Sequence, residues 1–252
     1  MTTYPSNLTD SQWQYIAKFL DVQRRRKYDL REVMNAILYL IKPGCQWRML
    51  PRDFPHWKLV YYYFSVWNSS GLFEVMQEAL VENTRSASGR KEQPTTGIID
   101  SQSVKSTLVG AQSKGFDAGK RVMGIKRHVV TDTLGLVLTI VVHSAALQDR
   151  DGAKVVIEKL KQCWQGVTLL FADGGYRGRL IEWARRLFSI SLQVIKRDRL
   201  HTFKVLPKRW IVERTFAWID TNRRTAKNYE RLTLNSQAIV QLAAIRTMIN
   251  RF

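Results

Sequence analysis

Acidic residues are scarce in this chain. Its 252 residues include 21 Asp and Glu against 40 Lys and Arg, which gives a formal net charge of +19. An excess of this size goes beyond what solubility requires and implies a polyanionic partner, with nucleic acid as the first candidate. An anionic membrane is the weaker alternative, because the positive charge is spread along the chain and no basic amphipathic anchor stands out.

Cysteines and long apolar runs are also few. Cys45 and Cys163 stand alone, without a CxxC spacing or adjacent histidines, which argues against a zinc site or a disulfide framework and fits a reducing compartment. No apolar run approaches the roughly 18 residues of a membrane span, and the first residues lack the pattern of a secretory signal. A hydrophobic share of 45% still supports a sizeable core, in one large domain or two small ones.

The N-terminal third predicts a helical domain. A capping box at Thr9 and Gln12 begins a helix that runs to about residue 20, and Asp29 begins a second that ends near Gly44. Two more helices are predicted at residues 57–68 and 72–83, followed by a polar linker at 84–96. We therefore expect a helical domain at residues 1–90 and a second domain at 91–252. Helices with short basic links also suit a helix-turn-helix-like reader of DNA, although that signal is weak.

The remaining residues predict a mixed sheet. Strands are expected at 97–104, 127–131, 136–143, 168–172 and 192–195, and helices at 151–164, 180–188, from about Pro207 through Glu213, and at 235–250. Three strands followed by alternating helices and strands suit an α/β fold. In such a fold the first three strands form an antiparallel meander, and helices cover the faces of the sheet.

Two aspartates and one glutamate are candidates for a site. Asp100 and Asp173 lie within or just after apolar runs, where a carboxylate is costly unless it has a partner. Each could also be an ordinary cap or turn residue. Glu213 lies away from the apolar stripe of its predicted helix, so by itself it could be a solvated glutamate. Sites in such sheets gather at the ends of central strands, where the two aspartates can meet.

Three carboxylates on rigid elements suit magnesium, which prefers oxygen ligands in octahedral geometry. Two such ions can flank a phosphodiester, one activating a water or a 3′-hydroxyl and the other stabilising the leaving oxygen.

Several segments resemble bacterial insertion-sequence transposases of the DDE type. Residues 97–106 are similar to their first-aspartate segment, residues 171–178 to the second, and residues 209–218 to the glutamate segment. Residues 35–39 and 44–51 match the helical N-terminal domain of these proteins. Lys120, Gly124 and residues 126–128 match a basic motif between the aspartates, and residues 223–224 and 229–231 match the segment after the glutamate. The resemblance covers nearly the whole chain.

The resemblance implies that residues 1–90 are a helical DNA-binding domain and that residues 91–252 are a ribonuclease H-like catalytic domain that cleaves DNA and transfers strands. Asp100, Asp173 and Glu213 would be the catalytic residues and the ligands of two Mg²⁺ ions, for which Mn²⁺ can substitute. The partners would be double-stranded DNA, both the element's terminal inverted repeats and the target, and further copies of the chain in a homodimer or larger assembly. Such a protein works in the bacterial cytoplasm, at the nucleoid.

Basic residues are expected to contact the DNA backbone, with an ordinary solvated surface as the alternative. From the Tyr-Arg-Glu-Lys clamp of some relatives only Arg209 is carried over, since Leu206 and Asp220 fill the Tyr and Lys places. The full set of expected contacts is Arg24, Arg25, Arg26, Lys27, Lys105, Lys126, Arg127, His128, Arg209, Arg223 and Arg224.

Two other functions fit the same pattern. A nuclease of this fold could only hydrolyse DNA, because one site serves both water and a 3′-hydroxyl. A non-catalytic DNA-binding protein could also derive from a transposase. Loss of one acid would favour that reading, but all three acids are present.

The net charge generates a direct prediction. Binding to a labelled duplex should weaken steeply as salt rises, with a linear dependence of log K on log salt, because Lys and Arg release counterions from phosphates. Titrations at several salt concentrations measure this slope, and a flat response would remove the argument from charge.

Overall fold

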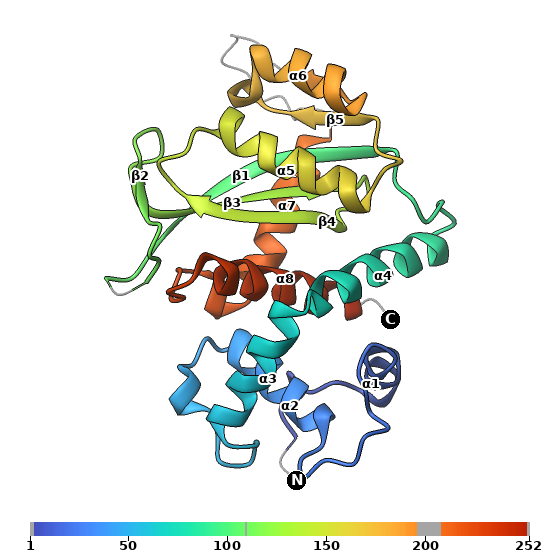
Figure 1. Cartoon of the computed structure of the whole chain (residues 1–252), viewed down its shortest axis with the longest axis vertical. Coiled ribbons are helices and arrows are strands. Elements are labelled where there is room, and N and C mark those ends of the chain that lie inside the picture. Colours follow the sequence, from blue (N-terminus) through green and yellow to red (C-terminus); the bar gives the residue numbers. More distant parts are fainter. Residues whose placement is uncertain (1–2, 109, 196–207, 251–252) are drawn as a thin grey trace.

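The computed structural model describes residues 3–108, 110–195 and 208–250. Four helices form its N-terminal part at the lower end of Figure 1: α1 (Asp10–Ala17), α2 (Leu30–Ile41), α3 (Trp57–Ser69) and α4 (Leu72–Ala87). A short 3-10 helix, η1 (Trp47–Met49), lies between α2 and α3. The capping box at α1 is present, since the side chain of Thr9 accepts from the Gln12 N–H and that of Gln12 accepts from the Thr9 N–H. The four predicted helices are confirmed, and α4 extends into the predicted linker.

One mixed sheet of six strands forms the centre of the molecule. The strands are β1 (Thr96–Lys105), β2 (Gly115–Asp117), β3 (Val122–Thr131), β4 (Val137–Ser144), β5 (Leu169–Ala172) and β6 (Ser191–Val194). Their order is β2-β3-β1-β5-β6, and β4 also pairs with β3. As predicted, β1, β3 and β4 form an antiparallel meander, while β5 and β6 run parallel to β1. The short strand β2 was not predicted from the sequence.

The pairing register sets the positions of the two aspartates. Ile98 of β1 lies opposite Phe171 of β5 in a parallel pair. Continuing both strands by two residues brings Asp100 level with Asp173, which directly follows β5. The fold therefore brings two carboxylates from distant segments to the same level, with Asp100 within β1 and Asp173 just beyond the end of β5.

Helices cover both faces of the sheet. α5 (Asp149–Cys163) packs on β3 and β4, and α6 (Arg179–Phe188) packs on β6 and α5. On the other face α7 (Arg209–Asp220) packs on β1 and β3. Two 3-10 helices, η2 (Gly174–Tyr176) and η3 (Arg223–Thr225), follow β5 and α7. Residue Pro207, where the helix of Glu213 was expected to begin, lies outside the described residues, and the described helix begins at Arg209.

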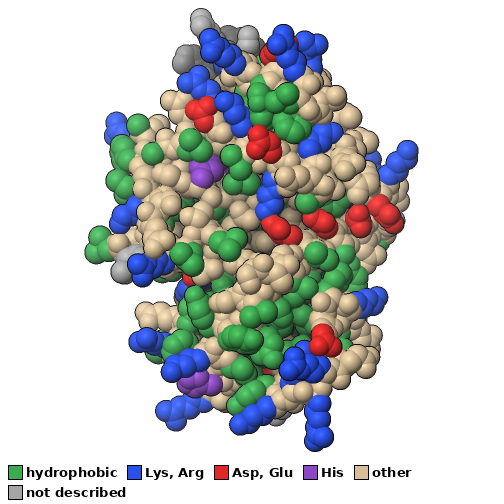
Figure 2. Space-filling model, in the orientation of Figure 1, with side chains coloured by type: hydrophobic (Ala, Val, Ile, Leu, Met, Phe, Trp, Pro, Cys, Tyr) green, Lys and Arg blue, Asp and Glu red, His purple; other side chains and the backbone are tan. Residues whose placement is uncertain are grey.

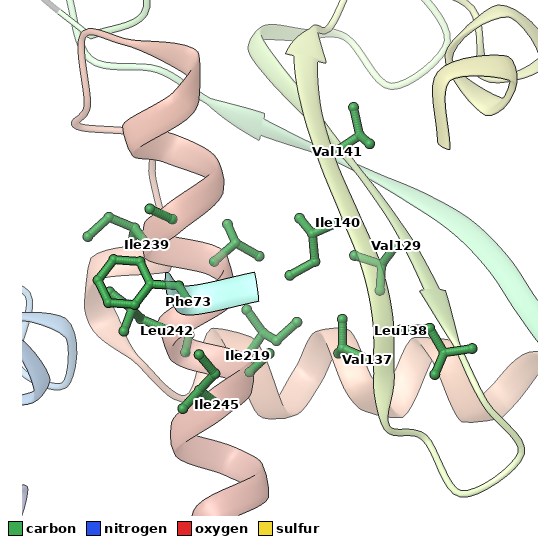
Figure 3. Close-up of a cluster of buried hydrophobic side chains, with 14 of the residues drawn as sticks. Phe73, Val129, Val137, Leu138, Ile140, Val141, Ile219, Ile239, Leu242 and Ile245 are labelled. Atoms are coloured by element: carbon green, nitrogen blue, oxygen red, sulfur yellow. The ribbon is translucent and has the colours of Figure 1, made fainter. Parts of the chain in front are cut away.

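The last helix joins the helical part to the sheet. α8 (Thr233–Ile249) packs against α2, α3, α4, α7 and β4, and twelve of its residues are buried. Figure 3 shows Phe73 of α4 beside Leu242 and Ile245 of α8, with Val137 and Ile140 of β4 close by. The two predicted domains thus share one hydrophobic core, and their division at residue 90 stays a prediction. Within the described residues, no helix is both long and apolar enough to span a membrane.

A buried ion pair ties α4 to the turn between β3 and β4. Arg85 pairs with Asp132, whose side chain is fully buried and also accepts from the backbone N–H groups of Leu134 and Leu136. Replacing one partner would leave the other charge buried and uncompensated.

We expect Asp132→Ala to lower the free energy of unfolding by about 3–5 kcal/mol, the usual cost of breaking a buried ion pair from one side. Urea unfolding measures the change. Glu158→Ala, on the exposed side of α5, is the control and should change stability by no more than about 0.5 kcal/mol. A similar small effect for Asp132→Ala would show that this pair does not stabilise the junction.

Candidate active site

The structure brings the three predicted carboxylates to one region. Asp100 lies in the middle of β1, Asp173 follows the end of β5, and Glu213 lies one turn into α7. Arg209 stands between two of them: its guanidinium is 3.6 Å from Asp173 Oδ2 and 3.2 Å from Glu213 Oε1. Because Arg209 and Glu213 are four residues apart on α7, they share one face of the helix. This face is distinct from the buried one, as the sequence pattern predicted.

Asp100 is partly buried and electrostatically unsatisfied. Burial raises the pKa of Asp100 to about 6, and the nearby carboxylate of Asp173 acts in the same direction. The backbone N–H of Ser101, which donates to Asp100 Oδ1 over 2.7 Å, and the cations of Arg209 and Lys120 oppose this rise. The net rise means that the ionised form of Asp100 lacks compensating positive charge.

Asp173 is held by the turn that follows β5. Its Oδ1 accepts from the backbone N–H of Gly175 over 2.8 Å, so it caps η2. Asp173 is therefore a turn residue, which is the alternative that the sequence left open. Its Oδ2 faces Arg209 at the same time. The two interpretations of this aspartate are compatible, since one oxygen fixes the turn and the other faces Arg209, and its role in a site stays a prediction.

The donor set fits a hard divalent cation. All three side chains offer carboxylate oxygens, and the raised pKa of Asp100 reflects a site that would gain from added positive charge. In the described part of the chain no three His, Cys, Asp or Glu side chains are grouped closely enough to hold an ion as they stand. Arg209 provides the positive charge next to Asp173 and Glu213 in this arrangement.

Four of the expected DNA contacts are buried, which argues against that role. Lys126, Arg127 and His128 expose 4%, 2% and 0% of their surfaces, and Arg224 exposes 6%. The reason is topological for the first three, because β3 pairs with β1 on one edge and with β4 on the other, and helices cover both faces. The alternative of an ordinary solvated surface is also wrong for these three residues, for the same reason.

These four buried side chains have internal partners. Lys126 pairs with Asp149 at 2.8 Å and with Asp117 at 3.4 Å. Arg127 donates to the Thr225 carbonyl and lies 3.5 Å from Asp220. The rings of His128 and His143 share a hydrogen bond of 2.7 Å, and Arg224 pairs with Glu230. The side chains of residues 126–128 are therefore directed into the domain, towards partners on neighbouring segments.

The other predicted contacts differ in their exposure. Arg24, Arg25, Lys27, Lys105 and Arg223 are exposed. Arg26 is partly buried and pairs with Asp21 at 3.1 Å, and Arg209 faces the carboxylates as described above. Figure 2 shows Lys and Arg side chains spread over the visible face, with groups towards both ends of the molecule. The exposed residues remain available for phosphates.

Sequence reasoning gave no role near the carboxylates to four polar residues, which are Gln102, Lys120, Asp149 and Asp220. Lys120 donates to the Ser101 carbonyl over 3.0 Å, and Asp149 accepts from the Ser101 hydroxyl over 2.8 Å. On the other face Gln102 donates to Asp220 over 2.6 Å. Lys120 is part of the basic motif between the aspartates. Asp220 was noted only because it fills the Lys place of the Tyr-Arg-Glu-Lys clamp. Asp149 gave only the signal of an acid at the start of a helix.

The sheet order and the flanking helices define a ribonuclease H-like domain. Residues 91–248 match the family described as "Transposase DDE domain", and residues 8–77 match the "Putative transposase of IS4/5 family". The chain belongs to the family of transposases with a DDE domain. The resemblance found in the sequence is thereby confirmed.

A curated relative agrees with this assignment. The "Putative transposase for insertion sequence element IS402" of Burkholderia cepacia is 30% identical over 115 residues, which are 43% of this chain. The matched region spans about half of that relative, 54% of its length.

The environment of Asp100 generates a stability prediction for the metal-free protein. Its pKa is 3.8 in the ordinary state and about 6 when folded, so the folded protein binds the proton more tightly than the unfolded chain does. The free energy of unfolding should therefore fall as the pH rises through about 4 to 6 and stay lower above that range.

Asp100→Asn should remove this cost and stabilise the protein in chelator by up to about 3 kcal/mol at neutral pH. The gain should be smaller at about pH 5 than at about pH 7.5. Thermal unfolding at both pH values measures it, with Asp151→Asn as a control on the exposed start of α5. Equal or lower stability of Asp100→Asn at neutral pH would contradict the electrostatic description of this site.

Proposed function

We propose that this protein is a DNA transposase that cleaves the ends of its mobile element and joins them to target DNA by phosphoryl transfer. Asp100, Asp173 and Glu213 would be its catalytic residues. The observation that carries the proposal is that Asp173, at the end of β5, and Glu213, on α7, meet at Arg209, and that Asp100 of β1 lies near enough for Asp173 and Arg209 to act on its pKa. The family membership and the relative described as serving an insertion sequence element support the same reaction class.

The three carboxylates would hold Mg²⁺, with Mn²⁺ as a substitute, as two ions. When bound, these ions supply an activated oxygen nucleophile and neutralise the charge that develops on the leaving oxygen. Asp173 would keep its hydrogen bond to the Gly175 N–H, which fixes its orientation through the reaction. Arg209, with its guanidinium between Asp173 and Glu213, is suited to contact a phosphate that approaches the same carboxylates.

The DNA partner would be double-stranded, first as the terminal inverted repeats of the element and then as the target. Its backbone would meet the exposed cations Arg24, Arg25, Lys27, Lys105 and Arg223, which contribute to the net charge of +19. Two DNA ends must be held together for coupled joining, so a homodimer or a larger assembly on DNA is part of the proposal. Such a substrate places the activity at the nucleoid, in the bacterial cytoplasm.

The variant Glu213→Gln distinguishes an enzyme from a protein that only binds DNA. The substitution keeps the shape of the side chain and removes its charge, and the side chain lies away from the buried face of α7. Binding to terminal-repeat DNA should persist, while cleavage and strand transfer should fall by several orders of magnitude. Gel-shift titration and a single-turnover cleavage assay with Mg²⁺ measure the two properties.

Glu158→Gln is the matched control, because it removes the same charge from an exposed helical position on α5. Its cleavage rate should equal that of the wild type. Cleavage by Glu213→Gln at the wild-type rate would show that Glu213 is a surface residue and would overturn the assignment. A wild type that hydrolyses ends without joining them would instead be a nuclease, and one that binds without cleaving would be a DNA-binding protein.

A further inference from the structure

We propose that Asp149 is a positioning residue that ties the strand of Asp100 to the turn of Asp173. It would act from the face of the sheet opposite Asp100, through Ser101 and the loop at Gly175. The inference rests on the proposed function, because it concerns how the two catalytic aspartates keep their separation. Asp149 lies at the start of α5 and is not among the three carboxylates of the proposed site.

The first contact is with β1. The Ser101 hydroxyl donates to Asp149 Oδ1 over 2.8 Å, while the Ser101 carbonyl accepts from Lys120 Nζ over 3.0 Å. Successive residues of a strand point to opposite faces, so Ser101 holds β1 from behind while Asp100 faces α7. The Ser101 N–H also donates to Asp100 Oδ1 over 2.7 Å. A fixed Ser101 therefore fixes the peptide group that orients the Asp100 carboxylate.

Asp149 also lies near the turn after β5, which contains Gly175. A methyl group added at Gly175 would lie 3.4 Å from Asp149 Oδ2 and 3.1 Å from Asp173 Oδ1. The carboxylate of Asp149 thus lies near the turn whose Gly175 N–H holds Asp173, and α5 packs on that turn. One carboxylate reaches both segments, with Oδ1 towards β1 and Oδ2 towards the turn.

Lys126 keeps Asp149 in place. Its Nζ lies 2.8 Å from Asp149 Oδ1 and 3.4 Å from Asp117 Oδ2, and it donates to the Leu147 carbonyl over 2.8 Å. Only 5% of the Lys126 side chain is exposed. Burying a cation among fixed acceptors is weak as a source of stability, but it specifies where its partners lie. Because Lys126 is buried, it cannot contact DNA, but it can hold the carboxylate of Asp149 in a fixed position.

Asp149→Asn is the principal test, because asparagine keeps the shape and an acceptor oxygen but loses the charge that holds Lys126. Single-turnover cleavage of terminal-repeat DNA should slow by about 10–100-fold, the usual effect of a residue that orients metal ligands. The Kd for DNA should stay at the wild-type value. Mn²⁺ binding to the DNA-free protein, measured by calorimetry, should weaken by a similar factor. Asp151→Asn, two residues further along α5, is the matched control and should match the wild type in all three measurements.

Ser101→Ala provides an independent variant, since it removes the hydroxyl but leaves the Asp149–Lys126 pair intact. It should slow cleavage and weaken Mn²⁺ binding, and the double variant should be no worse than Asp149→Asn alone, because both act through one contact. Should Asp149→Asn fail to fold, Ser101→Ala decides the question.

Wild-type cleavage and Mn²⁺ affinity in either folded variant would overturn the proposal. Losses that multiply in the double variant would also overturn it, because the two residues would then act separately. Failure of the proposed function is distinguishable: it appears as full activity of Glu213→Gln, whatever Asp149→Asn does. If Glu213→Gln is inactive and Asp149→Asn cleaves normally, only the positioning role is lost.

Discussion

Like charges must be held together in this protein against their own repulsion. Asp100 and Asp173 are brought level by the parallel pairing of β1 with β5, and α7, on the face to which Asp100 points, adds Glu213. Burial and mutual repulsion oppose the ionised state of Asp100, so the arrangement persists only because rigid elements impose it. Arg209 offsets part of this cost by lying between Asp173 and Glu213. A site of this kind lowers stability, and under the proposed function it would gain the capacity to hold divalent cations.

The Lys and Arg side chains of this chain fall into two groups, one buried and one exposed. Cations of β3 are internal: Lys126 balances Asp117 and Asp149 on the α5 face, while Arg127 reaches Asp220 and Thr225 on the α7 face. Both contacts tie the helices to β3, which pairs with the strand that carries Asp100. The exposed cations form the other group and supply the field that attracts a polyanion. Net charge alone overstates the number of residues that can reach DNA.

Sequence patterns predicted the meander and the order of all α-helices and strands except β2, because apolar periodicity is a local signal. They also singled out Asp100, Asp173 and Glu213, whose catalytic role stays a prediction. They did not predict the burial of Lys126, Arg127 and His128, since whether a polar strand is central or at an edge depends on pairing between distant segments. Asp149 was missed for a related reason: an acid in the first turn of a helix is common, and only the fold brings it to Ser101. The short strand β2 has too few residues to give a pattern.

The central claim is that three carboxylates act as one catalytic unit. Its most direct test compares single-turnover cleavage of terminal-repeat DNA by Asp100→Asn, Asp173→Asn and Glu213→Gln with that of the triple variant. Each single loss should be several orders of magnitude, and the triple variant should be little slower than the slowest single one, because residues of one unit are not additive. Losses that multiply across the three positions, or a wild-type rate in any single variant, would contradict the account.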